Sequence, residues 1–226
     1  MKGIIFDLDG TMVDNMMIHH RAWQRKLKEL GMDLTLPEVM QKVHGVNEEI
    51  LERLFGDRFT LEERIIFSRE KEAEYRNIFK SDLKLITGLH EFLMILKESK
   101  IPLGIGSAAP PENVDFVLDN LCIRHFFKVI LHARNVSAGK PHPEIYLKVA
   151  EGLGLPVNDC LIFEDSPVGV EAARRAGSSA IVVTTTHTED DFKDFPNVLK
   201  FIHDYTGIDM DQLKIISQNS RIVIKN

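Results

Sequence analysis

The sequence is poor in cysteine and has no excess of positive charge. Its 226 residues include only two cysteines, too few for a disulfide framework or a cysteine-based metal site. The 28 lysines and arginines are outnumbered by 34 acidic residues, which gives a net charge of −6. A protein that binds the phosphate backbone of nucleic acids normally needs a basic surface. The composition therefore argues against a disulfide-stabilised protein and against nucleic acid as a partner.

Long apolar runs are absent as well. No stretch approaches the roughly 18 uninterrupted apolar residues of a membrane span, so we expect no membrane partner. The acids Asp7 and Asp9 are foreign to a signal peptide, so we expect none and predict a cytoplasmic protein. With 44% hydrophobic residues the chain can still bury a sizeable core. Its length suits one large domain, or a domain that carries a smaller insert.

Short apolar runs alternate with longer helix-like stretches over most of the chain. This alternation predicts a Rossmann-like α/β fold, a parallel sheet with helices on both faces. Such sheets bind ligands beyond the carboxyl ends of their strands. The expected strands are Ile4–Phe6, Ile101–Ile105, Val129–Leu131, Leu161–Phe163 and Ala180–Val183, and the expected helices are Gly88–Ser99, Pro111–Asn120, His142–Gly152 and Pro167–Ala176.

An interval without convincing strands, residues 15–80, interrupts the alternation. It holds four amphipathic helical stretches, His19–Leu30, Leu36–Val43, Glu48–Phe55 and Leu61–Phe79. A helical block of this size, placed directly after the first strand, predicts a small all-helical second domain. We therefore expect an α/β core of residues 1–14 and 81–226 with an inserted helical domain of residues 15–80.

Two of the expected strand ends carry paired acids. Asp7 and Asp9 follow the first strand, with a spacing that points both side chains of an extended chain to the same side. Glu164 and Asp165 follow the fourth strand. Like charges this close destabilise one another unless a cation or a shared proton compensates, and hard oxygen ligands favour Mg²⁺. Taken alone, an Asp-x-Asp pair fits an acidic helix cap equally well.

Two further strand ends carry groups that suit an anion. Ser107 and Ala108 follow the second strand, where a hydroxyl and backbone N–H groups can approach closely. Lys140 follows the third strand and offers a point charge for a phosphate. Taken singly, Ser107 fits a helix cap and Lys140 fits a solvent-exposed lysine. Because the ends of parallel strands converge at one edge, the four together predict a single site.

The four strand ends together resemble the motifs of the haloacid dehalogenase superfamily of phosphotransferases, and in particular its β-phosphoglucomutase-like branch. The helical insert resembles the cap domain of that branch, and the resemblance extends over residues 1–185. The similar segments are Asp7–Thr11 (DLDGT), Ser107, Lys140 within Gly139–Tyr146 (GKPHPEIY), and Glu164–Gly177 (EDSPVGVEAARRAG).

The resemblance implies a Mg²⁺-dependent phosphatase that acts on a small phosphorylated metabolite through an aspartyl-phosphate, as a monomer or weak dimer. Asp7 would be the nucleophile, and Asp9 would be the general acid and base. The implied phosphate-binding residues are Ser107, Ala108 and Lys140. The implied Mg²⁺ ligands are Asp7, the backbone carbonyl of Asp9 and Asp165, with Glu164 close by. The implied substrate contacts in the cap are His19, Trp23, Glu48 and Lys71, although Trp23 also fits core packing.

Three other functions compete with this one. A haloacid dehalogenase needs no metal, and members of that branch resemble Asp-x-Tyr at the first motif, where this chain has Asp9. A non-enzymatic binding protein on the same fold would not need every catalytic position filled. A β-phosphoglucomutase-type mutase must hold a sugar bisphosphate at both ends. Where that family carries an arginine in the cap, this chain has Glu48, whose charge repels a second phosphate. We therefore favour the phosphatase.

Overall fold

The computed structural model describes residues 1–223, and the chain divides into two compact units. The α/β unit consists of Met1–Asp14 and of the chain from Lys84 onward. The helical unit consists of Asn15–Leu83. The chain therefore returns from the helical unit to the α/β unit after Leu83, slightly later than residue 80, where the sequence predicted this boundary.

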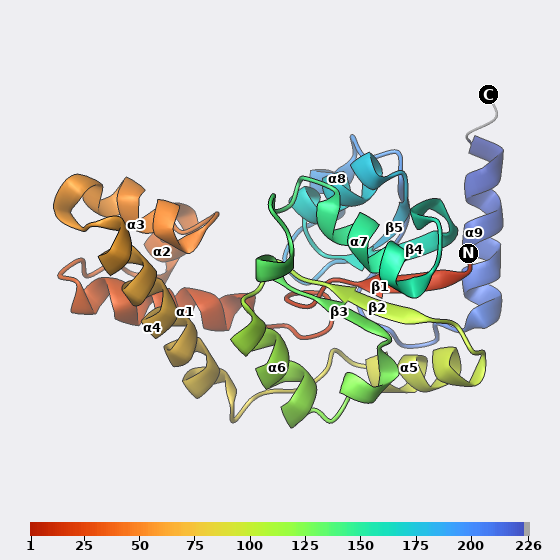
Figure 1. The fold of residues 1–226 in the computed structure, drawn as a ribbon, viewed down its shortest axis with the longest axis horizontal. Coiled ribbons are helices and arrows are strands. Elements are labelled where there is room, and N and C mark those ends of the chain that lie inside the picture. The colour runs from red at the N-terminus through yellow and green to blue at the C-terminus, as the bar shows by residue number, and fades with distance from the viewer. Residues whose placement is uncertain (224–226) are drawn as a thin grey trace. The chain divides into compact units, whose positions relative to one another are not determined.

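The α/β unit is built on a six-stranded parallel sheet (Figure 1). Its strands are β1 (Gly3–Phe6), β2 (Leu103–Gly106), β3 (Val129–Leu131), β4 (Cys160–Glu164), β5 (Ser179–Val183) and β6 (Val198–Ile202). Their order across the sheet is β3-β2-β1-β4-β5-β6, so β1 is central. Phe6 of β1 pairs in register with Ile105 of β2 and Phe163 of β4, which sets the ends of these three strands level with one another.

Helices cover both faces of this sheet, as the apolar strands require. They are α5 (Leu89–Glu98), α6 (Pro111–Asn120), α7 (Glu144–Leu153), α8 (Pro167–Ala176) and α9 (Met210–Val223), with short 3₁₀ turns at Arg124–Phe126, Ala133–Asn135, Val157–Asp159 and Glu189–Phe192. Figure 1 shows α7 and α8 over one face and α5 and α6 over the other. Ile162 packs with Tyr146 and Val170 in one core cluster, whereas the Phe6 ring contacts Phe92 on the opposite side.

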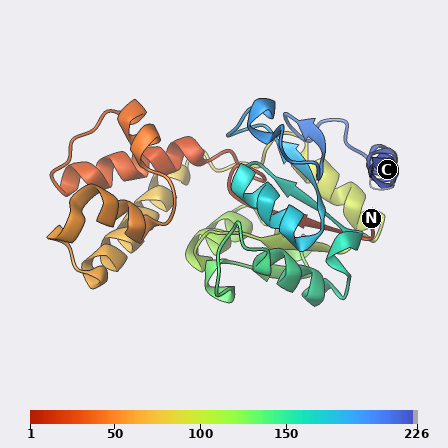
Figure 2. The ribbon, with the colours of Figure 1, turned by 90° about the horizontal axis from the view of Figure 1, so that it is seen from above.

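The helical unit contains α1 (Met16–Glu29), α2 (Leu36–Lys42), α3 (Asn47–Phe55), a 3₁₀ turn at Gly56–Arg58, and α4 (Leu61–Phe79) (Figure 2). A capping box begins α4, because Thr60 Oγ1 accepts from the Glu63 backbone N–H at 3.2 Å while the Glu63 carboxylate accepts from Thr60 N–H at 2.8 Å. Buried apolar side chains from α1, α2 and α3 form the core of the unit: Trp23, Leu27, Val39, Ile50 and Leu51.

The predicted α/β class is confirmed, and β6 and α9 are additions that the sequence did not predict. The strand expected from Ile101 begins only at Leu103, because Pro102 has no N–H to donate to a neighbouring strand. β6 lies at the edge of the sheet and is mostly half-buried, so it lacks the continuous apolar run of the central strands. Among the described residues, none of the helices has the length and apolar character needed to span a bilayer.

Candidate active site

Three buried carboxylates gather at the carboxyl edge of the sheet, at the ends of β1 and β4. One oxygen from each of Asp7, Glu164 and Asp165 lies within 4.8 Å of the other two. The strand register explains this proximity, because Phe6 and Phe163 are paired and the residues that follow them emerge side by side. The structure therefore brings together acids that the sequence places far apart.

Lys140 is the cation of this cluster. It arrives on the loop that follows β3, and its side chain is only 7% exposed. Its Nζ donates to Asp7 Oδ1 at 2.5 Å and to Glu164 Oε1 at 2.7 Å. One lysine thus faces three carboxylates, and the cluster keeps an excess of negative charge.

Burial and this uneven balance shift the pKa values of the acids. Burial raises the pKa of Asp7 to about 7, although the neighbouring Lys140 lowers it. Burial and the charges of Glu164 and Asp7 hold the pKa of Asp165 well above its usual value. Burial also acts to raise the pKa of Glu164, but Lys140, together with the hydrogen bonds from the Ser166 N–H and the Tyr146 hydroxyl, outweighs burial and the pKa is lowered. A second cation would therefore be drawn to Asp7 and Asp165 more than to Glu164.

Glu164 also differs in that both of its oxygens already accept from protein donors. Oε1 accepts from Lys140 and, at 2.7 Å, from the Tyr146 hydroxyl. Oε2 accepts from the backbone N–H groups of Asp165 and Ser166 at 2.9 and 3.0 Å. Only a glycine fits at Gly169, where a Cβ would lie 1.6 Å from Glu164 Oε1. Glu164 thus holds Lys140 and its own loop in place.

The loop after β1 turns at Gly10, which has a φ of +75°. A Cβ at this position would lie 2.2 Å from Asp165 Oδ2 and 2.9 Å from Thr186 Oγ1. Both the backbone conformation and the lack of space therefore require glycine. Asp9, one residue earlier, does not join the three clustered carboxylates, but its charge contributes to raising the pKa of Asp7.

Ser107 and Ala108 follow β2 at the same edge of the sheet. The pairing of Ile105 with Phe6 sets this strand end level with Asp7. Ser107 is buried, and its Oγ accepts from the Ala109 backbone N–H at 3.0 Å, whereas Ala108 is exposed. The segment thus places a buried hydroxyl beside an exposed, small residue.

Of the four residues predicted in the helical unit, three lie together in one cluster, namely His19, Trp23 and Lys71. Glu48 is not part of this cluster. The Nζ of Lys71 lies 3.0 Å from His19 Nδ1, 2.8 Å from Glu72 Oε1 and 5.5 Å from the centre of the Trp23 ring. Trp23 itself is 2% exposed and belongs to the core of the unit. Glu48 is half-buried in the first turn of α3.

Glu72, which the sequence did not single out, balances the charge of Lys71. Burial acts to raise its pKa, but Lys71, together with His19 and the Asn47 amide, outweighs burial and lowers the pKa to about 2. Burial, together with Lys71, lowers the pKa of His19 to about 3, so its ring is neutral at pH 7. That ring stacks on Tyr75 with centroids 3.8 Å apart. The cluster therefore pairs one cation with one carboxylate.

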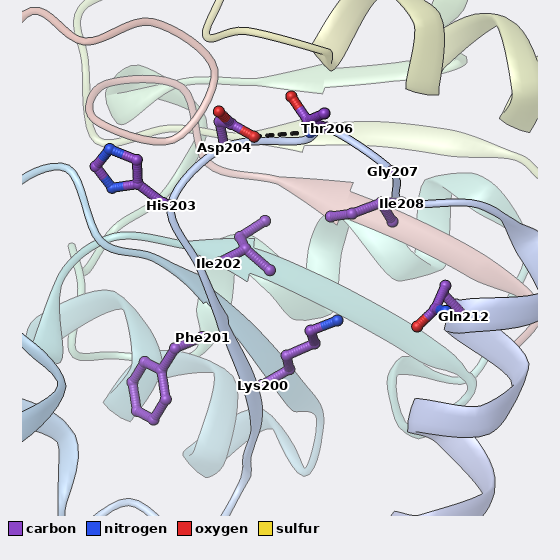
Figure 3. A pocket seen from close by; sticks show the side chains of 9 residues that line it. All are labelled: Lys200, Phe201, Ile202, His203, Asp204, Thr206, Gly207, Ile208 and Gln212. Atoms are coloured by element: carbon purple, nitrogen blue, oxygen red, sulfur yellow. Dashed lines mark hydrogen bonds between the residues drawn. The ribbon is translucent and has the colours of Figure 1, made fainter.

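A hollow in the α/β unit lies apart from the residues predicted for the site. It is formed by the end of β6 and the start of α9, and its lining includes Lys200, His203, Asp204 and Gln212 (Figure 3). Asp204 accepts from the Thr206 backbone N–H at 2.8 Å. No residue of the lining belongs to the carboxylate cluster.

Comparison with known families assigns the chain. The family model of haloacid dehalogenase-like hydrolases matches residues 1–177, and the chain belongs to this family. A phosphorylated carbohydrates phosphatase of Thermotoga maritima is 31% identical over 185 residues, which cover 80% of this chain and 84% of that protein. A β-phosphoglucomutase of Bacillus subtilis is 29% identical over 191 residues, which cover 81% and 83%.

A solved structure is similar over nearly the full length. The crystal structure of a haloacid dehalogenase hydrolase of family IA, variant 3, from Entamoeba histolytica matches with a TM-score of 0.88 at 26% identity. The match covers 97% of this chain and 100% of that one. Together these comparisons confirm the family and the enzyme class that the four motifs predicted.

Proposed function

We propose that this protein is a Mg²⁺-dependent phosphatase that hydrolyses a small phosphorylated metabolite, such as a sugar phosphate, through an aspartyl-phosphate on Asp7. The observation that carries the proposal is the cluster of three buried carboxylates around the single Lys140. Burying three acids around one lysine is costly for stability, which favours a functional role for the cluster over a purely structural one. The relative named as a phosphatase supports the reaction class.

The donor set of the cluster fits Mg²⁺, which prefers hard oxygen ligands. Asp7 and Asp165 would hold the ion together with the backbone carbonyl of Asp9. Glu164 would stay close by, because both its oxygens already accept from protein donors. Mg²⁺ bound here would offset the repulsion between the Asp7 carboxylate and an anionic phosphate.

The side chains of the α/β unit would share the remaining work. Asp7 attacks the phosphorus, and Asp9 donates a proton to the leaving oxygen. Asp9 then accepts a proton from the water that hydrolyses the aspartyl-phosphate. The Ser107 hydroxyl, the Ala108 N–H and Lys140 would hold the phosphoryl oxygens. Lys140 is suited to this role because its Nζ already contacts the nucleophile.

The proposal extends to the helical unit as a cap that recognises the rest of the substrate through the half-buried His19 and Glu48, whereas the predicted contacts Trp23 and Lys71 are each only 2% exposed. Its charges favour a single phosphate over a bisphosphate. A second phosphate needs a cation that is free to bind it, whereas the Lys71 ammonium is 2.8 Å from the Glu72 carboxylate. Glu48 adds a further negative charge. Water, rather than a sugar hydroxyl, would then be the final phosphate acceptor.

A panel of phosphate esters tests the proposal. Phosphate release is measured from sugar phosphates, phosphoglycolate, nucleotides and pyrophosphate, with Mg²⁺, after EDTA, and after Mg²⁺ is restored. We expect turnover of a small ester that EDTA abolishes reversibly. Full activity after exhaustive chelation would refute the metal assignment and favour the dehalogenase, and an absence of turnover across the panel would favour a binding protein.

A second assay separates the phosphatase from a β-phosphoglucomutase-type mutase. The enzyme is incubated with β-glucose 1-phosphate and a catalytic amount of the 1,6-bisphosphate, and both products are followed. Phosphate release alone supports the phosphatase. Glucose 6-phosphate that forms much faster than inorganic phosphate would overturn it. A gain of isomerisation in Glu48→Arg, but not in Glu48→Gln, would locate the cause of the preference in the charge at this position.

A further inference from the structure

The loop that joins β3 to α7, residues 132–143, carries Lys140 (Figure 1). Most residues of this loop are exposed, although Val136 packs against the core. The Lys140 side chain, by contrast, is only 7% exposed, and its Nζ contacts Asp7 and Glu164. A mostly exposed loop therefore has to hold a buried ammonium at one place, which requires anchors for its backbone.

Two side chains of α7 anchor the backbone of this loop. Glu144 Oε2 accepts from the backbone N–H groups of Ser137 and Ala138, both at 3.0 Å. Glu144 Oε1 lies 2.7 Å from the Nζ of Lys148, one turn along the helix. Lys148 Nζ in turn donates to the backbone carbonyl of Asn135 at 2.8 Å. The pair thus binds three backbone groups of residues 135–138.

The Glu144 carboxylate is suited to be such an anchor. The hydrogen bonds from Lys148 and from the backbone N–H groups of Ala138 and Ser137 lower its pKa, so it is ionised at neutral pH. An acid in the first turn also stabilises a helix by itself. That effect needs no contact with the loop, however, whereas both N–H donors to Glu144 belong to the loop.

The anchor lies directly before Lys140 in the chain. Ala138, which donates to Glu144, is two residues before the lysine. On the other side of Lys140, the His142 backbone N–H donates to the Gly139 carbonyl at 2.9 Å and closes a turn around it. The backbone at Lys140 is therefore fixed on both sides, and Glu144 provides the link to the helix.

We propose that Glu144 is a positioning residue for Lys140, which it holds in place by fixing the loop backbone two residues before the lysine. Lys148 completes the anchor through Asn135. The inference rests on the proposed function, because it takes Lys140 to bind the phosphoryl oxygens of the substrate. Glu144 itself would touch neither the substrate nor the reacting atoms. Without the anchor the ammonium would shift, and misplacing a group by about 1 Å can cost up to about 100-fold in rate.

The test measures the dissociation constant of inorganic phosphate, by isothermal titration calorimetry on the full chain with Mg²⁺. Glu144→Met keeps the length of the side chain and removes both acceptors, and we expect phosphate to bind about tenfold more weakly. Glu144→Gln keeps an oxygen for the two N–H groups and should retain most of the affinity. Lys148→Met releases Asn135 but keeps the Glu144 contacts, so it should weaken binding by less. It also tests the anchor should Glu144→Met not fold.

A double variant shows whether Glu144 acts through Lys140. Lys140→Met removes the ammonium, so adding Glu144→Met to it should weaken phosphate binding no further. A purely structural effect of Glu144 would not depend on Lys140. A loss of the same size in both backgrounds would therefore overturn the inference.

Glu171→Met is the matched control. The Glu171 side chain is 17% exposed, against 18% for Glu144, and it also forms ion pairs on a helix, with Arg174 and Arg175 of α8. Its loss should leave phosphate affinity unchanged. Unchanged affinity in Glu144→Met, or an equal loss in Glu171→Met, would overturn the inference. If the wild type neither binds phosphate nor releases it from any ester of the panel, the proposed function fails instead, which is a different result.

Discussion

Both units of the protein bury a lysine beside carboxylates, but their charge balance differs. In the helical unit Lys71 is paired with Glu72, and the adjoining His19 is neutral at pH 7. In the α/β unit Lys140 faces Asp7 and Glu164, with Asp165 beside them. The first cluster is complete, whereas the second has more carboxylates than cations, an imbalance that protons meet in the metal-free protein and that a further cation would meet instead. A buried ion pair by itself is weak evidence of function, and it is the excess of one sign that distinguishes the site.

The largest expected effect follows from removing one acid of the unbalanced cluster. Asp7→Asn keeps the shape of the side chain but removes the proposed nucleophile, so phosphate release should fall by roughly a thousandfold or more. The metal-free protein should be as stable as wild type in urea, or more stable, because one of three crowded negative charges is gone. Retention of more than about a tenth of the wild-type rate would exclude Asp7 as the nucleophile.

Disrupting the balanced cluster of Lys71 and Glu72 should change the stability of the helical unit, whereas the previous substitution changes activity. Lys71→Met leaves the Glu72 carboxylate buried without its cation, which should lower the free energy of unfolding by about 3–5 kcal/mol. Urea unfolding can be followed by the fluorescence of Trp23, the only tryptophan of the chain and part of this unit's core. Adding Glu72→Gln should recover most of the loss. If the double variant is no more stable than Lys71→Met, the two side chains are not coupled.

The two units should also respond to pH with opposite signs between about pH 5 and 8. The pKa of Asp7 is raised to about 7, so the folded α/β unit holds a proton that the unfolded chain releases, and its metal-free stability falls as the pH rises. The pKa of His19 is lowered to about 3, so the unfolded helical unit binds a proton that the folded one does not. Its stability is therefore complete above about pH 6.5 and falls as the pH drops.

Hydrogen exchange at pH 5 and pH 8, corrected for intrinsic rates, resolves this difference on peptides from each unit. The lowered pKa values of Glu72 and Glu164 act below this window and leave the comparison clear. Protection should increase with pH in the helical unit and decrease in the metal-free α/β unit. Changes of the same sign in both units would contradict the assigned pKa shifts.

The smallest expected effect concerns the support of Lys140. The Tyr146 hydroxyl donates to Glu164 Oε1, and its ring centre lies 4.8 Å from Lys140 Nζ. Tyr146→Phe removes the hydrogen bond and keeps the ring, so kcat/KM should fall by about tenfold. Tyr146→Leu, which also removes the ring beneath the ammonium, should cost more. Unchanged kinetics in both variants would show that Lys140 is held without this side chain.

The sequence was most informative where residue type and strand position coincide. The acids Asp7, Glu164 and Asp165 could be expected together because parallel strands bring their carboxyl ends to one edge. The pairing of Lys140 with Glu164 could not be predicted, because strand order indicates which residues reach the same edge of the sheet but not which side chains meet there.

Glu72 and β6 escaped prediction for different physical reasons. Neighbouring positions on a helix normally point apart, so nothing in the order Lys71-Glu72 indicated an ion pair. The β6 segment Val198–Ile202 contains Lys200 and is only partly buried, as an edge strand can be, and so it lacks the continuous apolar pattern of β1 or β4. In both cases tertiary packing, rather than local pattern, decides the outcome.

The central place of β1 has a consequence for synthesis of the chain. Ile4 pairs with Leu103 on one side and Leu161 on the other, so β1 is synthesised before both of its partners and waits for them. At about 5–20 residues per second, roughly eight to thirty seconds separate Ile4 from Leu161. The helical unit, by contrast, is complete at Leu83, before either partner of β1 exists. Asp7, at the end of β1, is thus made well before the residues of β2 and β4 that flank its strand.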